Sequence, residues 1–424
     1  MRIRKLILAA GLAIAAVVPA ARVRAEPALS VEQLVEIGLE ANPQVKSARA
    51  RWDSAKHSIR QNYAPADPTF GYLNVDSATN GFSDASLHTL AVTQALQFPG
   101  KAILQGDHAI RAADIARLTY AATIRDLRAQ VETAYYQDLL DGSLADVTAE
   151  NVDNLKRVRQ VTQVAYSANQ VTQTDFISAE FDLAAARQQG DQLRTAEQND
   201  RTVLNQLLYR PPDEPLAIDR RLELRTLETP LDTLTQRAGE VRQEILETAL
   251  TERNSAIALQ LARLEYAPDY TLGYTFDNYL LSSFAPSPNG RMQDHGFSIS
   301  FNAPIFFWFK QNEDVRRASY DLEAARDDLG SIKSQTAATV TGLYRTAQLA
   351  YRTASLYRDS LIPLARQDFA VALVAYSSGK VDFLTLAGAL RRFYDARVAY
   401  LQAANQFLAG EVALEQAIGE PLPR

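Results

Sequence analysis

The sequence predicts a mainly helical chain in which long helices form a coiled-coil tube and four β-strands contribute to a transmembrane β-barrel. Long proline-free stretches carry apolar residues at steps of three and four, which indicates helices. Short segments alternate apolar and polar residues, which indicates strands. Both patterns recur about 200 residues later along the chain, so we expect two similar halves.

The first 25 residues have the layout of a secretory signal peptide. Arg2, Arg4 and Lys5 precede an apolar, uncharged stretch that is too short for a permanent membrane helix. We expect cleavage before Glu26, with a competing site at 20–21. Removal of residues 1–25 takes away five basic side chains and moves the formal charge from −6 to −11.

Composition excludes several classes of protein. The chain has no cysteine, which excludes disulfides, thiolate metal sites and a lipid anchor on cysteine. An acidic mature chain without basic runs argues against nucleic acid as a partner. After the signal peptide no segment approaches 18 consecutive apolar residues, so a helical membrane protein is excluded. A soluble protein or a β-barrel remains.

The long helices carry heptad seams. A helix from about Lys101 to Ala165 would extend roughly 100 Å, far more than a globular domain of this size needs. Near the end of the chain apolar residues alternate at +3 and +4 with two polar interruptions, as in a coiled coil. The same alternation occurs 207 residues earlier in the same phase. The later seam comprises Phe383, Leu386, Leu390, Phe393, Arg397, Tyr400, Ala404, Phe407, Glu411 and Leu414.

The repeat includes matches that alanine-rich helices alone do not explain. The tripeptide at Tyr63, Ala64 and Pro65 recurs at 266–268, and the tripeptide at 165–167 recurs at 375–377. Each half reads as a shorter helix, a strand pair and a long helical hairpin. The predicted division is a signal peptide at 1–25, a first repeat at 26–210, a linker at 211–230 and a second repeat at 231–424. The first repeat contains a strand pair at 68–98 and a helical hairpin at 101–209. The second repeat contains a strand pair at 268–303 and a helical hairpin at 311–418.

The strands have one apolar and one small, polar face, with Gln94 as an interruption. This pattern and a length of about ten residues fit transmembrane β-strands, although a sheet packed on helices would alternate in the same way. Trp308 lies among four aromatic residues at 306–309, where we expect a membrane-interface girdle, with a core cluster as the competing explanation. The expected lipid-facing residues are Leu90, Val92, Tyr270, Leu272, Tyr274, Phe276, Phe297, Ile299 and Phe301.

Four strands cannot close a barrel, whose minimum is about eight strands. An open sheet edge is not tolerated in hydrocarbon because its backbone groups would lack partners. The chain must therefore oligomerise, and a dimer, trimer or tetramer would supply 8, 12 or 16 strands. Counting strands does not choose among these ring sizes.

Four local segments, together with this plan, resemble the TolC family of outer-membrane efflux factors over almost the whole mature chain. The stretch 30–34 (SVEQL) and the stretch 41–45 (ANPQV) are similar to the family's N-terminal signature. The Tyr-Ala-Pro step before each strand pair is similar to the family's joints between helices and barrel. The stretch 376–384 (YSSGKVDFL) resembles its periplasmic helix-turn-helix tip.

The resemblance implies efflux by a homotrimer with a 12-stranded barrel in outer-membrane lipid, which continues into a periplasmic tube of helices. It also implies docking to a periplasmic adaptor protein and an inner-membrane efflux pump. The chain departs from the family at two places. Asn169 stands where glycine is common at the first tip, and 242–244 (RQE) stands where many relatives carry a proline.

The tips of the two helical hairpins are the expected control point of the channel. Reversals are expected at 167–172 and 377–381, and Asp175 and Asp382 follow them in the first turn of the returning helices. In a trimer each aspartate would form a ring of three that attracts cations, which makes both candidates for a pore gate. A carboxylate at a helix N-terminus is an equally good structural explanation. The candidates for adaptor contact are Asn169, Thr172, Gly379, Lys380 and Val381.

Enzymatic function is not expected, and no cofactor or metal is predicted. Four scattered histidines lack the spacing of a zinc site or a catalytic triad, and phosphate-binding glycine loops are absent. Only two methionines occur, so the choice of a soft metal ion as cargo would rest with the pump. Two alternatives remain: an exit duct for protein secretion, and a soluble periplasmic coiled-coil scaffold that osmotic shock would release.

Overall fold

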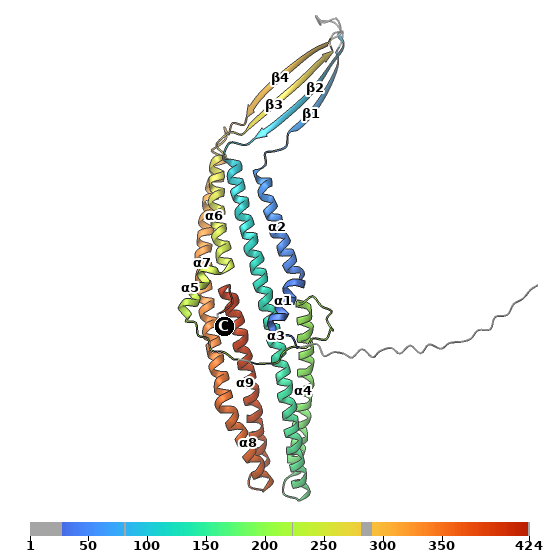
Figure 1. Cartoon of the computed structure of the whole chain (residues 1–424), viewed down its shortest axis with the longest axis vertical. Helices are drawn as coiled ribbons and strands as arrows, with labels where there is room; N and C mark the ends of the chain where they lie inside the picture. Colours follow the sequence, from blue (N-terminus) through green and yellow to red (C-terminus); the bar gives the residue numbers. More distant parts are fainter. Residues whose placement is uncertain (1–27, 80–81, 223, 281–290, 423–424) are drawn as a thin grey trace, which may run out of the picture.

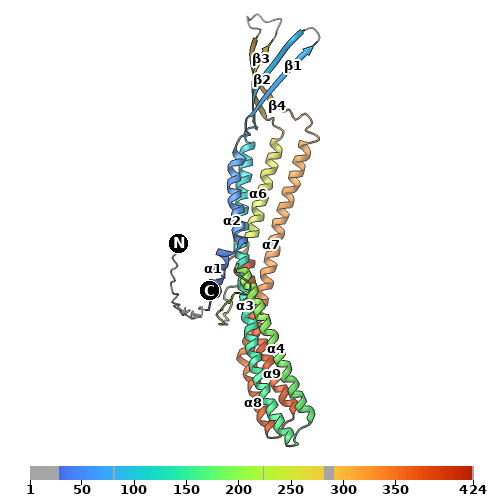
Figure 2. The ribbon, with the colours of Figure 1, turned by 90° about the vertical axis from the view of Figure 1, so that its right-hand side faces the viewer.

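The computed structural model describes residues 28–79, 82–222, 224–280 and 291–422, and the signal peptide expected at 1–25 lies outside them. The chain is elongated, with four strands at one end and the tips of two helical hairpins at the other (Figures 1 and 2). Within the described part of the chain, no helix is both long and apolar enough to cross a membrane.

The first half begins with two short helices rather than the single helix expected from the sequence. Its elements are α1 (Val31–Ala41), α2 (Pro43–Tyr63), β1 (Thr69–Thr79), β2 (Phe82–Leu96), α3 (Lys101–Ser167) and α4 (Gln173–Leu207). The Ser30 hydroxyl and the Gln33 side chain form a capping box that starts α1. The break at Asn42 arises because its backbone is extended, its side chain caps α2, and Pro43 supplies no N–H.

The second half repeats this order with one local difference in its long helix. Its elements are α5 (Leu231–Val241), α6 (Gln243–Leu264), β3 (Tyr270–Leu280), β4 (Arg291–Phe301), α7 (Gln311–Leu356), the π-helical turn η1 (Tyr357–Leu361), α8 (Ile362–Ser377) and α9 (Phe383–Ile418). At the end of η1 the N–H of Ile362 donates to the carbonyl of Tyr357, five residues back. Pro363 follows directly, and its ring cannot fit against a regular α-helical turn. The wider turn therefore accommodates the proline without ending the helix.

The four strands form one antiparallel sheet in the order β1-β2-β3-β4. Val92 on β2 pairs with Phe70 on β1 and with Tyr274 on β3, and Tyr274 pairs with Phe297 on β4. Directly paired residues in an antiparallel sheet lie on the same face. Most of the large apolar residues therefore share one face, whereas Leu73, Val75, Leu87 and Met292 lie on the other face, toward the end of the sheet that is far from the helices. Within the chain, β1 and β4 each leave one edge unpaired.

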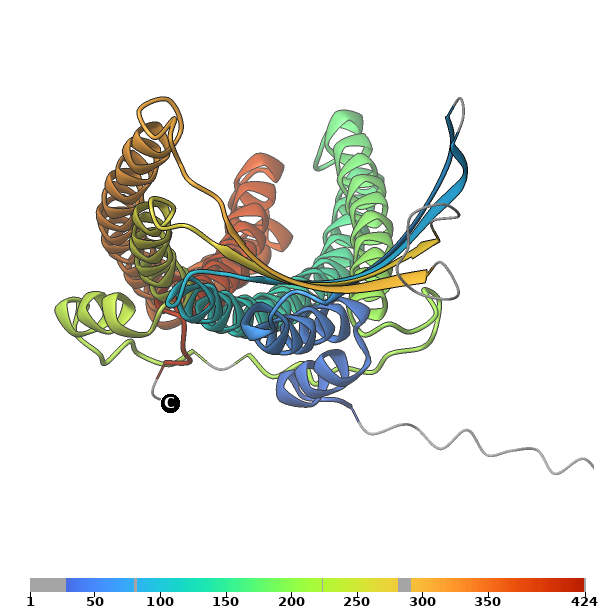
Figure 3. The same cartoon turned by 90° about the horizontal axis from the view of Figure 1, so that it is seen from above.

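The helices form a curved layer that the linker crosses. Seen along the long axis, the helices lie along an arc, and α1, α5 and the linker lie on its convex side (Figure 3). Ile218 of the linker forms a parallel bridge with Leu29 before α1. The Tyr135 hydroxyl on α3 donates to the carbonyl of Asp219 at 2.5 Å, and Arg220 donates to Glu197 on α4. The linker is thus fastened to the first hairpin near its middle.

A charged clamp occupies the segment 242–244 between α5 and α6. Arg242 adopts φ −62° and ψ 125°, nearly the same backbone as Asn42, so the break between α5 and α6 forms without proline. Arg125 on α3 donates to both carboxylate oxygens of Glu244, at 2.5 and 2.9 Å. The Gln243 side chain donates to the Gly419 carbonyl after α9 at 3.0 Å. The segment therefore ties α6 to both α3 and α9.

The electrostatics of the clamp favour the ionised carboxylate. Burial raises the pKa of Glu244, but hydrogen bonds from Arg125 outweigh it and lower the pKa to about 2. Because the folded-state pKa lies below the unfolded value, the clamp stabilises the fold above pH 4.5, and this stabilisation is lost as the pH falls toward 2.

Replacement of Glu244 by Gln tests the clamp. At pH 7 we expect Glu244→Gln to lower the free energy of unfolding by about 1–3 kcal/mol, because it leaves the largely buried Arg125 without its full charge partner. The difference from the wild type should shrink between pH 4.5 and 2 in thermal unfolding followed by circular dichroism. Asp153→Asn, which breaks an exposed pair with Lys156, is the control and should leave the stability nearly unchanged, because solvent screens the pair. Equal effects of the two variants would contradict the clamp.

Candidate functional site: helical tips and exposed sheet face

The two hairpin tips are built on the same turn. Asn169 and Gly379 are both left-handed, with φ of 54° and 69°. Their N–H groups donate to the carbonyls of Tyr166 and Tyr376, at 2.9 and 3.0 Å. Asparagine is among the few residues with a side chain that tolerate this conformation. The departure from glycine at position 169 therefore preserves the turn.

Both candidate gate aspartates cap the returning helices, but at different positions. Thr172 is the N-cap of α4, and the Asp175 carboxylate accepts the Thr172 N–H at 3.1 Å in a capping box. Asp382 is itself the N-cap of α9 and accepts the Thr385 N–H at 2.9 Å. Hydrogen bonds from the side chain and backbone of Thr385 hold the pKa of Asp382 below its usual value. The structure thus gives each carboxylate a capping role, and the gate remains a proposal.

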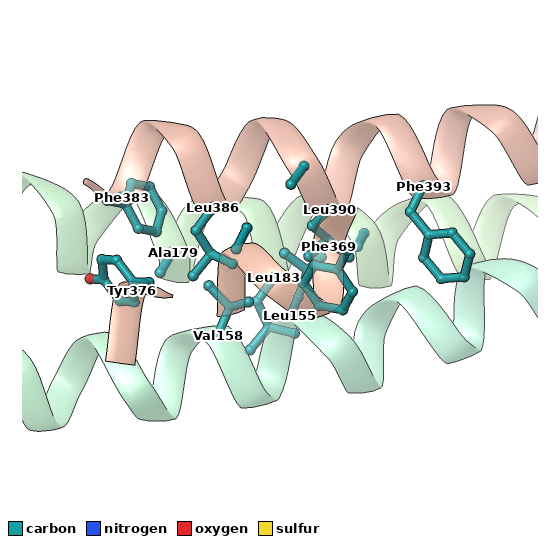
Figure 4. Close-up of a cluster of buried hydrophobic side chains, with 13 residues drawn as sticks. Leu155, Val158, Ala179, Leu183, Phe369, Tyr376, Phe383, Leu386, Leu390 and Phe393 are labelled. Carbon is teal, nitrogen blue, oxygen red and sulfur yellow. The ribbon is translucent and has the colours of Figure 1, made fainter. Parts of the chain in front are cut away.

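A hydrophobic cluster joins the two hairpins just above their tips (Figure 4). We call it the tip cluster, and its labelled members are Leu155, Val158, Ala179, Leu183, Phe369, Tyr376, Phe383, Leu386, Leu390 and Phe393. The Tyr376 hydroxyl donates to the buried Thr162 hydroxyl on α3 at 3.3 Å. The heptad seams predict which residues are apolar, but neither seam predicts this contact between hairpins.

The candidate adaptor contacts differ in exposure. Asn169, Thr172, Gly379 and Lys380 are exposed on the reversals. Val381 is half-buried and packs against the tip cluster. The first four can reach a partner directly, whereas Val381 can act only through the position of the turn.

The apolar face of the sheet, which we call the outer face, is open to the surroundings within the single chain. Phe297 is 86% exposed, and Leu90, Val92, Leu272, Tyr274, Ile299 and Phe301 are also exposed, whereas Phe276 is half-buried. Tyr270 belongs to the same face through its pairing with Phe301. This exposure excludes the alternative in which helices cover the sheet. The opposite face carries mainly small residues near the helices, where a Cβ on Gly273 would lie 2.4 Å from the Ser298 hydroxyl, and it carries the exposed Leu73, Val75 and Met292 farther from them.

The aromatic segment after β4 is also exposed. Phe306, Phe307, Trp308 and Phe309 each present 45% or more of their surface. Trp308 contacts all three phenylalanine rings, with centroids 5.0–6.1 Å apart. The competing explanation, a buried core cluster, is therefore wrong. The exposed rings fit the girdle expected from the sequence.

A buried lysine, which the sequence pattern does not predict, connects the sheet to the helices. Lys101, the first residue of α3, is 2% exposed. Its ammonium group donates to both carboxylate oxygens of Asp269 at 3.0 and 3.1 Å, and Asp269 also accepts the Phe98 N–H at 2.8 Å. This ion pair holds the end of β2 and the start of β3 to the first turn of α3. The signal in the sequence is a lysine at the start of α3 and an aspartate just before β3.

A group of acidic residues between α3 and α4 was also missed. Asp138 is fully buried, and burial raises its pKa to about 6 although Arg201 opposes the shift. Burial and the neighbouring Asp141 raise the pKa of Asp200 to about 7. Glu197 and Asp200 occupy the seam positions of the first half that lie 207 residues before Ala404 and Phe407, and these two charges are a trace of the group in the sequence. The part of the chain that the structure describes contains no group of three or more His, Asp or Glu residues placed to hold a metal ion.

Comparisons with known proteins agree on one family. The sequence profile described as "Outer membrane efflux protein" matches residues 34–208 and 234–420. The chain is 21% identical to the cobalt-zinc-cadmium resistance protein CzcC of Cupriavidus metallidurans, over 92% of this chain and 90% of CzcC. It is 21% identical to the outer membrane protein TolC of Escherichia coli, over 92% of this chain and 82% of TolC.

Solved structures share the fold. The crystal structure of CusC matches with a TM-score of 0.78 at 14% identity, and the match covers 92% of each chain. The outer-membrane channel OprN matches with a TM-score of 0.76 at 20% identity, over 92% of this chain and 89% of OprN. The expected fold class is confirmed by these matches.

Substitutions at the two left-handed positions test the tip turns. Gly379→Ala adds a Cβ in a left-handed conformation, which costs about 1 kcal/mol and should speed amide exchange in the second turn about fivefold. Asn169→Gly should leave exchange in the first turn nearly unchanged. The readout is hydrogen exchange by mass spectrometry. Gly239→Ala, at a helical position with open space around it, is the matched control and should not speed exchange. Unchanged exchange in Gly379→Ala would contradict the assigned turn.

Proposed function

This chain belongs to the outer membrane efflux protein family, and we propose on that premise that three copies of it form one channel. The family places the chain in the outer membrane as an efflux channel, with its helices extending into the periplasm. The proposal covers the ring size, the partners and the control point. The observation that carries it is the sheet, whose apolar outer face is exposed and whose two edges are unpaired within the chain.

The sheet supports assembly of a ring. In hydrocarbon each backbone group without a hydrogen-bond partner costs several kcal/mol, so β4 of one copy must pair with β1 of the next. Three copies give a closed barrel of 12 strands. A barrel of about eight strands is filled by its own side chains, whereas a larger ring leaves an aqueous lumen. The small, polar residues of the opposite face, such as Gly273 and Ser298, suit such a lumen.

The helices carry a second unpartnered apolar surface. Leu349, Leu356, Leu364 and Val371 are each more than half exposed on α7 and α8, and we call them the α7–α8 stripe. They are spaced by seven residues, except for eight residues across η1. One α-helical turn of about 3.6 residues and one π-helical turn of about 4.4 residues add to eight, so the stripe stays in line. We assign it to the helices of a neighbouring copy, which would close the arc of Figure 3 into a tube.

The channel in this proposal is passive and performs no catalysis. An inner-membrane pump supplies the energy and a periplasmic adaptor docks at the hairpin tips, through Asn169, Thr172, Gly379 and Lys380, with Val381 setting the turn. In this proposal the pump selects the cargo, which is either metal ions or other compounds. The name of the relative CzcC states resistance to cobalt, zinc and cadmium for that protein. A protein-secretion duct would share this architecture, and the type of pump at the tip distinguishes the two.

Charge on the α7–α8 stripe tests the trimer. We expect Leu364→Asp with Val371→Asp to raise the concentration for half-dissociation of the trimer at least about tenfold, because two charges would be buried between helices. Sedimentation of the purified protein in detergent measures this. Ala370→Asp, which adds a charge at an exposed position of α8 beside the stripe, is the control. If the wild-type protein sediments as a monomer, the proposed trimer is wrong.

Neutral substitutions at the tips separate gating from capping. Asp175→Asn with Asp382→Asn removes both carboxylates, while asparagine retains an oxygen that can cap a helix. We expect the cation-over-anion permeability ratio of single channels in planar bilayers to fall at least about twofold, because two rings of charge disappear. Asp191→Asn, at an exposed site on α4, should leave the ratio unchanged. If the tip variant also keeps the wild-type ratio and open probability, these aspartates are caps and nothing more.

A further inference from the structure

The outer face of the sheet carries the same tyrosine–histidine pair twice. The Tyr72 hydroxyl lies 2.9 Å from Nδ1 of His88, and the two rings stack with centroids 6.2 Å apart. The Tyr274 hydroxyl lies 2.7 Å from Nδ1 of His295, and these rings stack at 6.1 Å. The first pair spans β1 and β2 and the second spans β3 and β4. The two halves of the chain therefore place one pair on each hairpin.

The register places both pairs at one end of the apolar band. Tyr72 pairs with Leu90, and His88 lies two residues farther from the helices on the same strand as Leu90. Tyr274 pairs with Phe297, and His295 lies two residues farther from the helices on the same strand as Phe297. The outer face becomes polar at the level of His88, which pairs with Asn74 and Asn278, and at Gln293, two residues beyond His295. The opposite end of the band meets the aromatic segment at 306–309.

The band between these two limits has the thickness of a membrane. From Tyr270 to Asn278 the strand advances roughly 27 Å at about 3.4 Å per residue. A tilt of about 40° reduces this to roughly 20 Å along the membrane normal, and the exposed rings at 306–309 extend it toward the roughly 25 Å apolar band of outer-membrane barrels. His88 is level with the Asn278 limit of this band, and His295 is level with Phe276, roughly 5 Å short of it along the normal. Both imidazoles therefore lie near the boundary between acyl chains and headgroups that faces away from the helices.

The chemistry of the pairs fits an anionic headgroup. Among the outer-face side chains that the structure describes on β1–β4, the two imidazoles are the only basic groups. Arg291, the first residue of β4, has its backbone in the register of the same face, two positions beyond Gln293. If the tyrosine hydroxyl donates to Nδ1, the ring proton lies on Nε2, which is then free to donate outward. The tyrosine ring meanwhile supplies an apolar body at the boundary.

We propose that the Tyr72–His88 and Tyr274–His295 pairs bind phosphate groups of lipid headgroups in the outer leaflet, each through Nε2–H. This rests on the proposed function, since it requires the sheet to lie in the membrane as part of a closed barrel. In a trimer the six pairs form a ring that holds phosphorylated lipid around the channel. The tyrosines orient the imidazoles, and the histidines touch the ligand.

The test compares lipids that differ only in phosphate. Trimers in nanodiscs would be prepared with equal amounts of phosphorylated lipid A and its dephosphorylated form, and the lipid retained after extraction would be counted by native mass spectrometry. We expect the wild type to retain the phosphorylated form at least about fivefold over the other, and His88→Gln with His295→Gln to lose this preference. Asn278→Gln, on the same face, is the matched control and should behave as the wild type.

Two further measurements make the outcome decisive. Tyr72→Phe with Tyr274→Phe keeps the rings but removes the hydroxyls, and we expect a reduced preference with an unchanged trimer. Inorganic phosphate at about 10 mM should not displace the lipid, and displacement would show a site for free phosphate instead. If the wild type conducts ions as a trimer but retains both lipids equally, the inference fails while the channel stands. If no trimer inserts at all, the proposed function itself fails.

Discussion

Hydrogen bonding at the edges of the sheet is the constraint on which the rest of the structure depends. A four-stranded sheet with one exposed apolar face cannot satisfy its own edge strands in lipid. In the proposed ring, edges shared between copies satisfy them, and the same pairing sets where the helices lie, because each strand pair leads directly into a long helix. The arc of helices and the exposed α7–α8 stripe fit the same proposed ring.

The two halves of the chain share backbone conformations at equivalent positions but differ in the side chains that stabilise them. Thr172 and Asp382 occupy the same N-cap position with different chemistry, and either oxygen satisfies the first turn of the helix. Asn42 and Arg242 share one backbone conformation, although only the second half adds a clamp to Arg125. The long helix is continuous in the first half and contains a π turn in the second, yet the exposed stripe stays in line. Backbone geometry is repeated, whereas the side chains that secure it differ.

Local periodicity predicts most of this fold, because helices and strands differ in the spacing of their apolar residues. The long helix from Lys101, the heptad seam that includes Leu386 and the shared face of Val92 and Tyr274 all follow from such spacing. Contacts between distant segments do not. The Tyr376–Thr162 hydrogen bond joins residues 214 positions apart, and neither side chain interrupts its local pattern. Asp138 is buried without a neighbour in sequence that predicts it, because its charge partner Arg201 lies on the other helix of the hairpin. Single helices and strands are therefore predictable, while the residues that lock them together require the tertiary structure.

The joint between sheet and helices illustrates why the halves need not be equal. Lys101 and Asp269 form a buried ion pair at the joint between β2, β3 and α3. The repeat places Gln311 and Ala66 at the corresponding positions of the other joint, and these two residues cannot form an ion pair. In a ring that second joint lies between neighbouring copies, where β4 meets β1. The charged joint can thus form inside one chain before assembly, when a buried lysine must already have its partner. The joint between copies forms only on strand pairing, and an uncharged pair of residues there avoids leaving a buried charge alone in the unassembled chain.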